Sequence, residues 1–121
     1  KLTQAEEAFR DVLTGRMKFR GPKHAETFTT MNHLGVILKQ LGQFEEADSL
    51  LFIALEGFFA SHGPKHICTA EVAYTYGVLS VQQGRRNKAA YLFALAVGDL
   101  SFKSLDEYPN GFELSKFDEY I

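Results

Sequence analysis

The sequence lacks the features of several specialised protein classes. Cys68 is the only cysteine in 121 residues, which excludes an internal disulfide and favours a reducing, cytoplasmic compartment. Apolar runs are also short. The richest stretch, residues 50–60, is interrupted by Glu56 and Gly57, so no apolar run approaches the roughly 18–20 residues that a membrane helix needs. The net charge of -2 argues against nucleic-acid binding. With 45% hydrophobic and 23% charged residues and no targeting segment, the composition predicts a soluble, intracellular globular protein.

The sequence contains an internal repeat with a period of 42 residues. Gly21-Pro22-Lys23-His24 recurs as Gly63-Pro64-Lys65-His66. Eight further identities follow at the same shift: Thr27 with Thr69, Gly35 with Gly77, Val36 with Val78, Gln40 with Gln82, Gly42 with Gly84, Ala47 with Ala89, Leu50 with Leu92, and Ala54 with Ala96. Twelve identities at one shift indicate an internal repeat.

Each repeat unit is predicted to be a pair of helices. Apolar residues follow a helical period over residues 25–41 and again over residues 44–59, with Gly42 between them as a helix terminator. The Gly-Pro pair then separates one unit from the next. We therefore divide the chain into the second helix of a truncated preceding repeat (1–20), repeat 1 (21–62), repeat 2 (63–100) and an acidic, aromatic tail (101–121). Because the sequence begins with Lys1 inside an amphipathic pattern, we expect a fragment of a longer protein.

The repeat resembles a known family. Leu34-Gly35, Ala54 and the turn Gly42-Gln43-Phe44-Glu45-Glu46-Ala47 are similar to the tetratricopeptide repeat, and the Gly-Pro-Lys-His link resembles that of its longer kinesin-light-chain type. The resemblance implies an all-α array of helical hairpins, a right-handed α-solenoid, with a C-terminal extension. It places Asn32 on a family asparagine that faces the concave groove, where the second unit has Tyr74 instead.

The residues predict binding rather than catalysis. His62 and His66 are separated by Gly63-Pro64, so they do not share a helical face as an i, i+4 metal pair would. His24 and His66 occupy equivalent link positions, which favours a capping or packing role. Cys68 has no evident base partner and is interpreted as a small buried residue. We predict no enzyme activity, no metal and no cofactor.

The first helix of each unit is expected to line the concave side of the array. The candidate partner-binding residues are the positions on these helices that the apolar stripe leaves free: Thr29, Asn32, Val36, Lys39, Gln40, Glu71, Tyr74, Val78, Val81 and Gln82. Such a set suits an extended peptide or a helix of a protein partner, because amides bind backbone groups, Tyr74 offers a flat apolar ring and Lys39 attracts acids. A second candidate surface is basic: Arg10, Arg16, Lys18, Arg20, Lys23, Arg85, Arg86 and Lys88.

The tail leaves two interpretations open. Residues 1–100 carry 11 basic and 10 acidic side chains, whereas the tail carries two lysines and five acids. The tail either caps the last repeat or acts as a tethered ligand, and its candidate residues are Leu105, Asp106, Glu107, Tyr108, Phe112 and Phe117. Kinesin-light-chain-like domains bind aromatic, acidic peptides, which the tail resembles. The predicted function is a protein-interaction scaffold, and the alternative is a regulatory or self-assembling segment whose tail occupies its own or a neighbour's groove.

Overall fold

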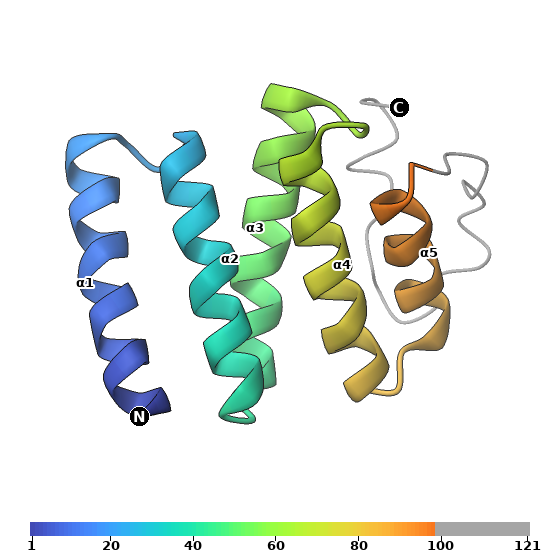
Figure 1. Ribbon diagram of the computed structural model, residues 1–121, viewed down its shortest axis with the longest axis horizontal. Coiled ribbons are helices and arrows are strands. Elements are labelled where there is room, and N and C mark those ends of the chain that lie inside the picture. Colours follow the sequence, from blue (N-terminus) through green and yellow to red (C-terminus); the bar gives the residue numbers. More distant parts are fainter. Residues whose placement is uncertain (99–121) are drawn as a thin grey trace. The chain divides into compact units, whose positions relative to one another are not determined.

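The computed structural model describes residues 1–98, which form five α-helices and no strand (Figure 1). Their bounds are α1 (Leu2–Phe19), α2 (Ala25–Gln40), α3 (Phe44–His62), α4 (Ile67–Gln82) and α5 (Arg86–Ala96). The expected all-α class is confirmed for this part of the chain. The six candidate tail residues, Leu105, Asp106, Glu107, Tyr108, Phe112 and Phe117, lie outside the described residues.

The chain divides within α3 into two compact units, residues 1–57 and the residues from Phe58 onward. In the first unit α1 and α2 lie side by side and antiparallel (Figure 1). The predicted helices over residues 25–41 and 44–59 are confirmed by α2 and α3. The second of them continues to His62 because the first left-handed residue after it is Gly63, at φ 85°.

The turn between α2 and α3 is set by local backbone bonds. Gly42, at φ 80°, donates its N–H to the Lys39 carbonyl, and Gln43 donates to the Leu38 carbonyl. These two bonds form a Schellman motif, which satisfies carbonyls that the end of a helix leaves unpaired. The second unit repeats the motif between α4 and α5, where Gly84 donates to Val81 and Arg85 donates to Ser80.

The Gly-Pro-Lys-His links start the first helix of each pair in the same way. His24 Nδ1 accepts a hydrogen bond from the Glu26 N–H at 3.1 Å, so the histidine side chain is the N-cap of α2. His66 caps α4 in the same manner, with the Cys68 N–H as donor at 3.1 Å. A threonine hydroxyl fixes each link by donating to the glycine carbonyl six residues earlier, at 2.7 Å in the first unit and 2.8 Å in the second. The predicted capping role of both histidines is confirmed.

Glycines let the helices of the first unit approach closely. A Cβ at Gly35 on α2 would lie 2.9 Å from the Leu51 side chain on α3. Gly57 on α3 lies under the ring of Phe28, and a Cβ there would collide with three ring carbons. The buried apolar residues of this unit are Phe28, Met31, Leu34, Ile37, Leu38, Ala47, Leu51, Ala54 and Leu55. Its core is therefore a helix pair packed through glycine notches that each receive one large side chain.

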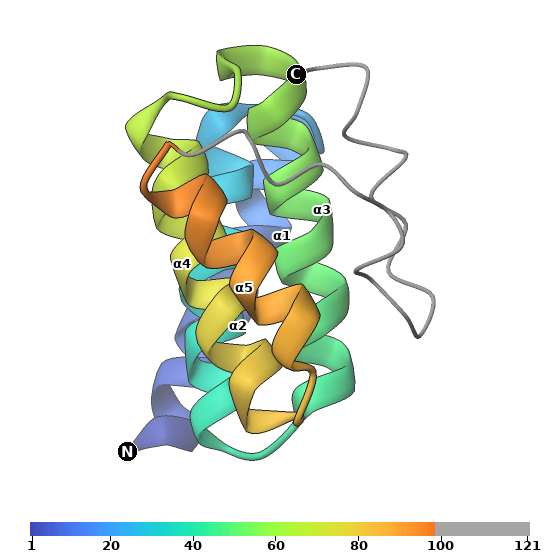
Figure 2. The same cartoon turned by 90° about the vertical axis from the view of Figure 1, so that its right-hand side faces the viewer.

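The second unit packs α4 against α5 on the same plan. The two helices lie antiparallel and side by side (Figures 1 and 2). A Cβ at Gly77 on α4 would lie 2.7 Å from the Phe93 ring on α5, the repeat counterpart of the Gly35 contact. The large buried residues here are Phe58, Phe59, Val72, Tyr76, Leu79, Tyr91, Leu92 and Leu95.

Candidate peptide-binding surface

The candidate partner-binding residues lie at three levels of burial. Exposed ones are Gln40, Glu71, Tyr74, Val81 and Gln82, half-buried ones are Thr29, Val36, Lys39 and Val78, and one, Asn32, is buried. In each unit these residues belong to one helix, α2 in the first and α4 in the second. The two helices differ at two of these positions, because α4 has Tyr74 and Val81 where α2 has Asn32 and Lys39.

Asn32 differs from the prediction. Its side chain is only 8% exposed, and its Oδ1 has no hydrogen-bond partner within residues 1–98. Buried acceptors are nearly always hydrogen-bonded, so this oxygen is an exception that the packing of α2 tolerates. Among the candidates on α2, Gln40 is exposed and Thr29, Val36 and Lys39 are half-buried, whereas Asn32 is buried.

Tyr74, Val78 and Val81 on α4 form an apolar strip at helical spacing, which we call the α4 stripe. Tyr74 is 60% exposed and Val81 is 55% exposed, which is unusual for large apolar side chains on one helical face. The Tyr74 ring contacts the Phe93 ring, with centroids 5.8 Å apart and planes at 50°. Phe93 itself sits against the glycine notch at Gly77. Phe93 therefore packs between Gly77 and the Tyr74 ring, and this packing positions Tyr74 in the α4 stripe.

The second predicted surface, the basic one, is largely engaged in the fold. The Arg10 guanidinium on α1 donates to both carboxylate oxygens of Glu46 on α3, at 2.7 and 2.8 Å, and to Glu6 at 2.9 Å. Arg16 donates to the Thr30 hydroxyl on α2 at 2.8 Å. Lys88 is buried, with its Nζ 4.4 Å from the centre of the Tyr76 ring. These three side chains join helices within their own units, so they contribute to the fold as well as to the candidate basic surface.

The ion pair between Arg10 and Glu46 changes the acidity of both groups. Hydrogen bonding by the guanidinium lowers the pKa of the Glu46 carboxyl below its usual value. The same bonds, first from Glu46 and then from Glu6, raise the pKa of Arg10. The sequence places Glu46 in the first turn of a helix, but only the fold shows that its partner comes from α1.

Two histidines flank the second Gly-Pro link, and one of them, His62, shares a hydrogen bond with the Ser61 hydroxyl at 2.6 Å. His62 and His66 do meet, with ring centroids 4.5 Å apart in an edge-to-face arrangement, and His62 contacts Phe58 in the same way. Sequence reasoning missed this contact because the Gly-Pro link folds back. Within residues 1–98 no three His, Cys, Asp or Glu side chains could hold a metal ion together. Cys68, predicted to be a small buried residue, is half-buried, and its backbone N–H completes the His66 cap.

Comparisons with known proteins do not assign this geometry to a family. No family model, curated protein or solved structure matches the chain. None of the helices within residues 1–98 is long and apolar enough to cross a membrane. Any functional assignment therefore depends on the surface itself.

Proposed function

We propose that this chain is a protein-interaction module of the tetratricopeptide type, whose first helices, α2 and α4, bind a partner peptide or helix. The observation that carries the proposal is the α4 stripe. Contiguous exposed apolar side chains commonly mark binding surfaces, and this strip lies on the helix that the repeat architecture assigns to the partner. Binding is favoured over catalysis because the stripe offers surface and no group of reactive side chains.

The repetition of local geometry supports the proposed fold type. Both units use a histidine N-cap, a threonine bond to the link glycine and a Schellman turn, each 42 residues apart. Both also pack a large side chain against a glycine of the first helix. A sequence that specifies identical caps, turns and notches at one period is typical of helical repeats.

The side chains around the stripe define the chemistry of the partner. Tyr74, Val78 and Val81 suit an apolar or aromatic side chain. Glu71 and Gln82, both exposed at the ends of the stripe, can bond backbone amides. We therefore propose that the partner is a peptide with an aromatic or apolar anchor side chain for the α4 stripe. The family resemblance further implies acidic side chains in that peptide.

A peptide selection tests this function. A displayed peptide library is selected against the immobilised full chain, and a synthetic copy of the consensus is then titrated by fluorescence anisotropy. We expect Y74A and V81S each to weaken binding at least about fivefold, since energetically important interface side chains contribute more than about 1 kcal/mol. The matched control is I53S, because Ile53 is also exposed but lies on α3. No enrichment, or equal losses in all three variants, contradicts the proposal.

Self-association is a second candidate function, favoured by α1. This helix has no buried residue, and its exposed large apolar side chains are Leu2, Val12, Met17 and Phe19. A second copy that covers these side chains would give a mass that rises with concentration in sedimentation experiments. V12E is expected to abolish that rise and T3E, also on α1, to preserve it; a constant monomer mass for the unmodified chain argues against self-association.

A further inference from the structure

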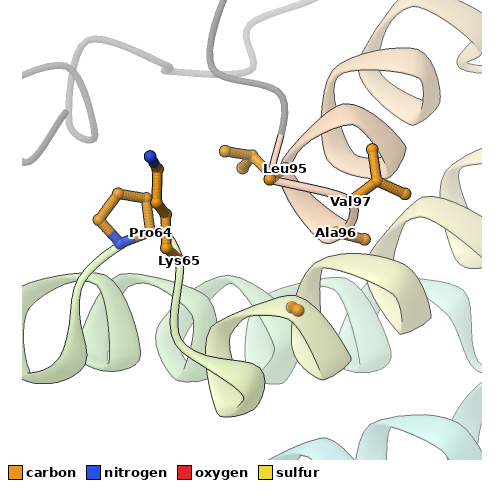
Figure 3. A pocket seen from close by; sticks show the side chains of 7 residues that line it. Pro64, Lys65, Leu95, Ala96 and Val97 are labelled. Carbon is orange, nitrogen blue, oxygen red and sulfur yellow. The ribbon is translucent and has the colours of Figure 1, made fainter.

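A pocket of about 320 Å³ lies in the second unit, between the link that precedes α4 and the end of α5. Pro64 and Lys65 stand on one side of it, and Leu95, Ala96 and Val97 stand on the other (Figure 3). Ala70 on α4 and Gly98 complete the lining. All of these residues belong to the second unit, and Lys65 is the only charged one among them.

The repeat explains why there is space at this point. Ala70 is the counterpart of Phe28, 42 residues earlier, and Ala96 is the counterpart of Ala54. In the first unit the Phe28 ring fills the corner between α2 and α3, where it lies on Gly57 and is 4% exposed. In the second unit an alanine stands where that ring would begin, and Val97 beside it is 81% exposed. The pocket is therefore the site of a phenyl ring that the second repeat does not supply.

The size of the pocket fits a ring with a short side chain. The volume of about 320 Å³ lies at the lower end of the range of about 300–1,000 Å³ that is typical of small-molecule sites. The pocket is partly open to solvent, and polar atoms form part of its lining. Pro64, Leu95, Ala96 and Val97 contribute aliphatic side chains, against which one face of an aromatic ring would pack.

Lys65 determines which group the ring should carry. Its side chain is exposed at the edge of the pocket, and no carboxylate within residues 1–98 forms an ion pair with it. An ammonium group beside aliphatic side chains favours a ligand that places an anion within its reach while a ring packs against those side chains. Lys23 is the repeat counterpart of Lys65, in the unit whose corner Phe28 already fills.

We propose that this pocket binds an aromatic carboxylate, with the ring taking the place that Phe28 has in the first repeat and the carboxylate paired with Lys65. Ala70 lies one helical turn before Tyr74, so the site adjoins the α4 stripe but has walls of its own from the link and from α5. The proposal does not depend on peptide binding by the stripe. V81S, which should impair peptide binding, is expected to leave the pocket unchanged.

The probe is 3-phenylpropionate, added to the isotopically labelled full chain and followed by NMR through the methyl groups of Ala70, Leu95 and Val97. We expect saturable shifts of these methyls with a millimolar dissociation constant, as befits so small a ligand. A70F, which restores the ring of the first repeat, should abolish the shifts of Leu95 and Val97. A90F adds the same ring on the exposed face of α5 and should leave them intact.

Charge is tested separately, so that the result does not depend on the folding of A70F. K65Q should weaken binding of the probe about two- to fivefold, as expected for an exposed ion pair, whereas K23Q should not change it. The neutral analogue 3-phenylpropanol should bind the unmodified chain and K65Q equally. Absence of saturable shifts at millimolar probe, shifts that persist in folded A70F, or equal losses in K65Q and K23Q would each overturn the proposal.

Discussion

The contact between Phe28 and Gly57 provides a quantitative test of how the first unit is held together. Phe28 is almost completely buried, and its ring occupies the notch where Gly57 has no side chain. Replacing Phe28 with alanine removes the ring and leaves a cavity, which typically costs about 3–5 kcal/mol. A domain of this size has a total stability of about 5–15 kcal/mol, so F28A should be strongly destabilised but measurable.

Gly57→Ala adds the second half of a double-mutant cycle. Alanine is favoured over glycine within a helix by about 1 kcal/mol. In the unmodified chain, however, the new Cβ would collide with the Phe28 ring, and overpacking of this kind costs about 1–3 kcal/mol. We therefore expect G57A to destabilise the unmodified chain by up to about 2 kcal/mol. In the F28A background the collision is absent, and the same change should stabilise the protein by about 0.5–1 kcal/mol.

Urea unfolding followed by circular dichroism at 222 nm measures all four free energies, and the slopes show whether unfolding remains two-state. The decisive result is the change of sign of the G57A effect between the two backgrounds. A G57A substitution that stabilises the unmodified chain, or that has the same effect with and without Phe28, would refute the notch mechanism. G15A is the matched control, because a Cβ at Gly15 on α1 meets nothing within 4 Å and should bring only the helix-propensity gain.

Two further predictions concern caps and charge. H24A and H66A should each lower the free energy of unfolding by about 0.5–2 kcal/mol, whereas asparagine at either position should retain most of the cap; thermal melts of all four variants check this. The ion pair between Arg10 and Glu46 should stabilise the protein above the pKa of unfolded Glu46 and stop doing so as pH falls through its lower folded pKa. E46Q should remove this acid sensitivity, worth about 0.2–1 kcal/mol for so exposed a pair, in urea titrations from neutral to acidic pH.

The helices were predictable because their signals are local. Apolar periodicity fixed the helix over residues 25–41 to within one residue of α2, and Gly42 and Gly63 mark the turns that follow two successive helices. The capping role of His24 and His66 also followed from their place in the repeated link. Each of these features depends on residues within one or two turns of each other in sequence, so the printed sequence contains most of the required information.

The surface was less predictable because it depends on what neighbouring helices supply. Asn32 occupies a helical face that the periodicity leaves polar, yet the fold buries it. Lys88 belongs to a basic run in the sequence but packs on Tyr76. The pocket left a sequence signal, the exchange of Phe28 for Ala70 between repeats, which comparison of the differing positions could have found. Residues that are identical in the two repeats identify the repeated fold. Residues that differ between them identify positions, such as Ala70, where one repeat lacks a side chain that the other has.

The Schellman turns have a consequence for the folding rate. Each turn brings the second helix of a pair back onto the first with only three residues between them, Leu41 to Gln43 and Gln83 to Arg85. Contacts within each pair consequently join residues that are close in sequence, and little chain entropy is lost before they form. Helical proteins with such short-range topology fold in microseconds to milliseconds. We expect each hairpin to form on this timescale during synthesis, as soon as its second helix has left the ribosome.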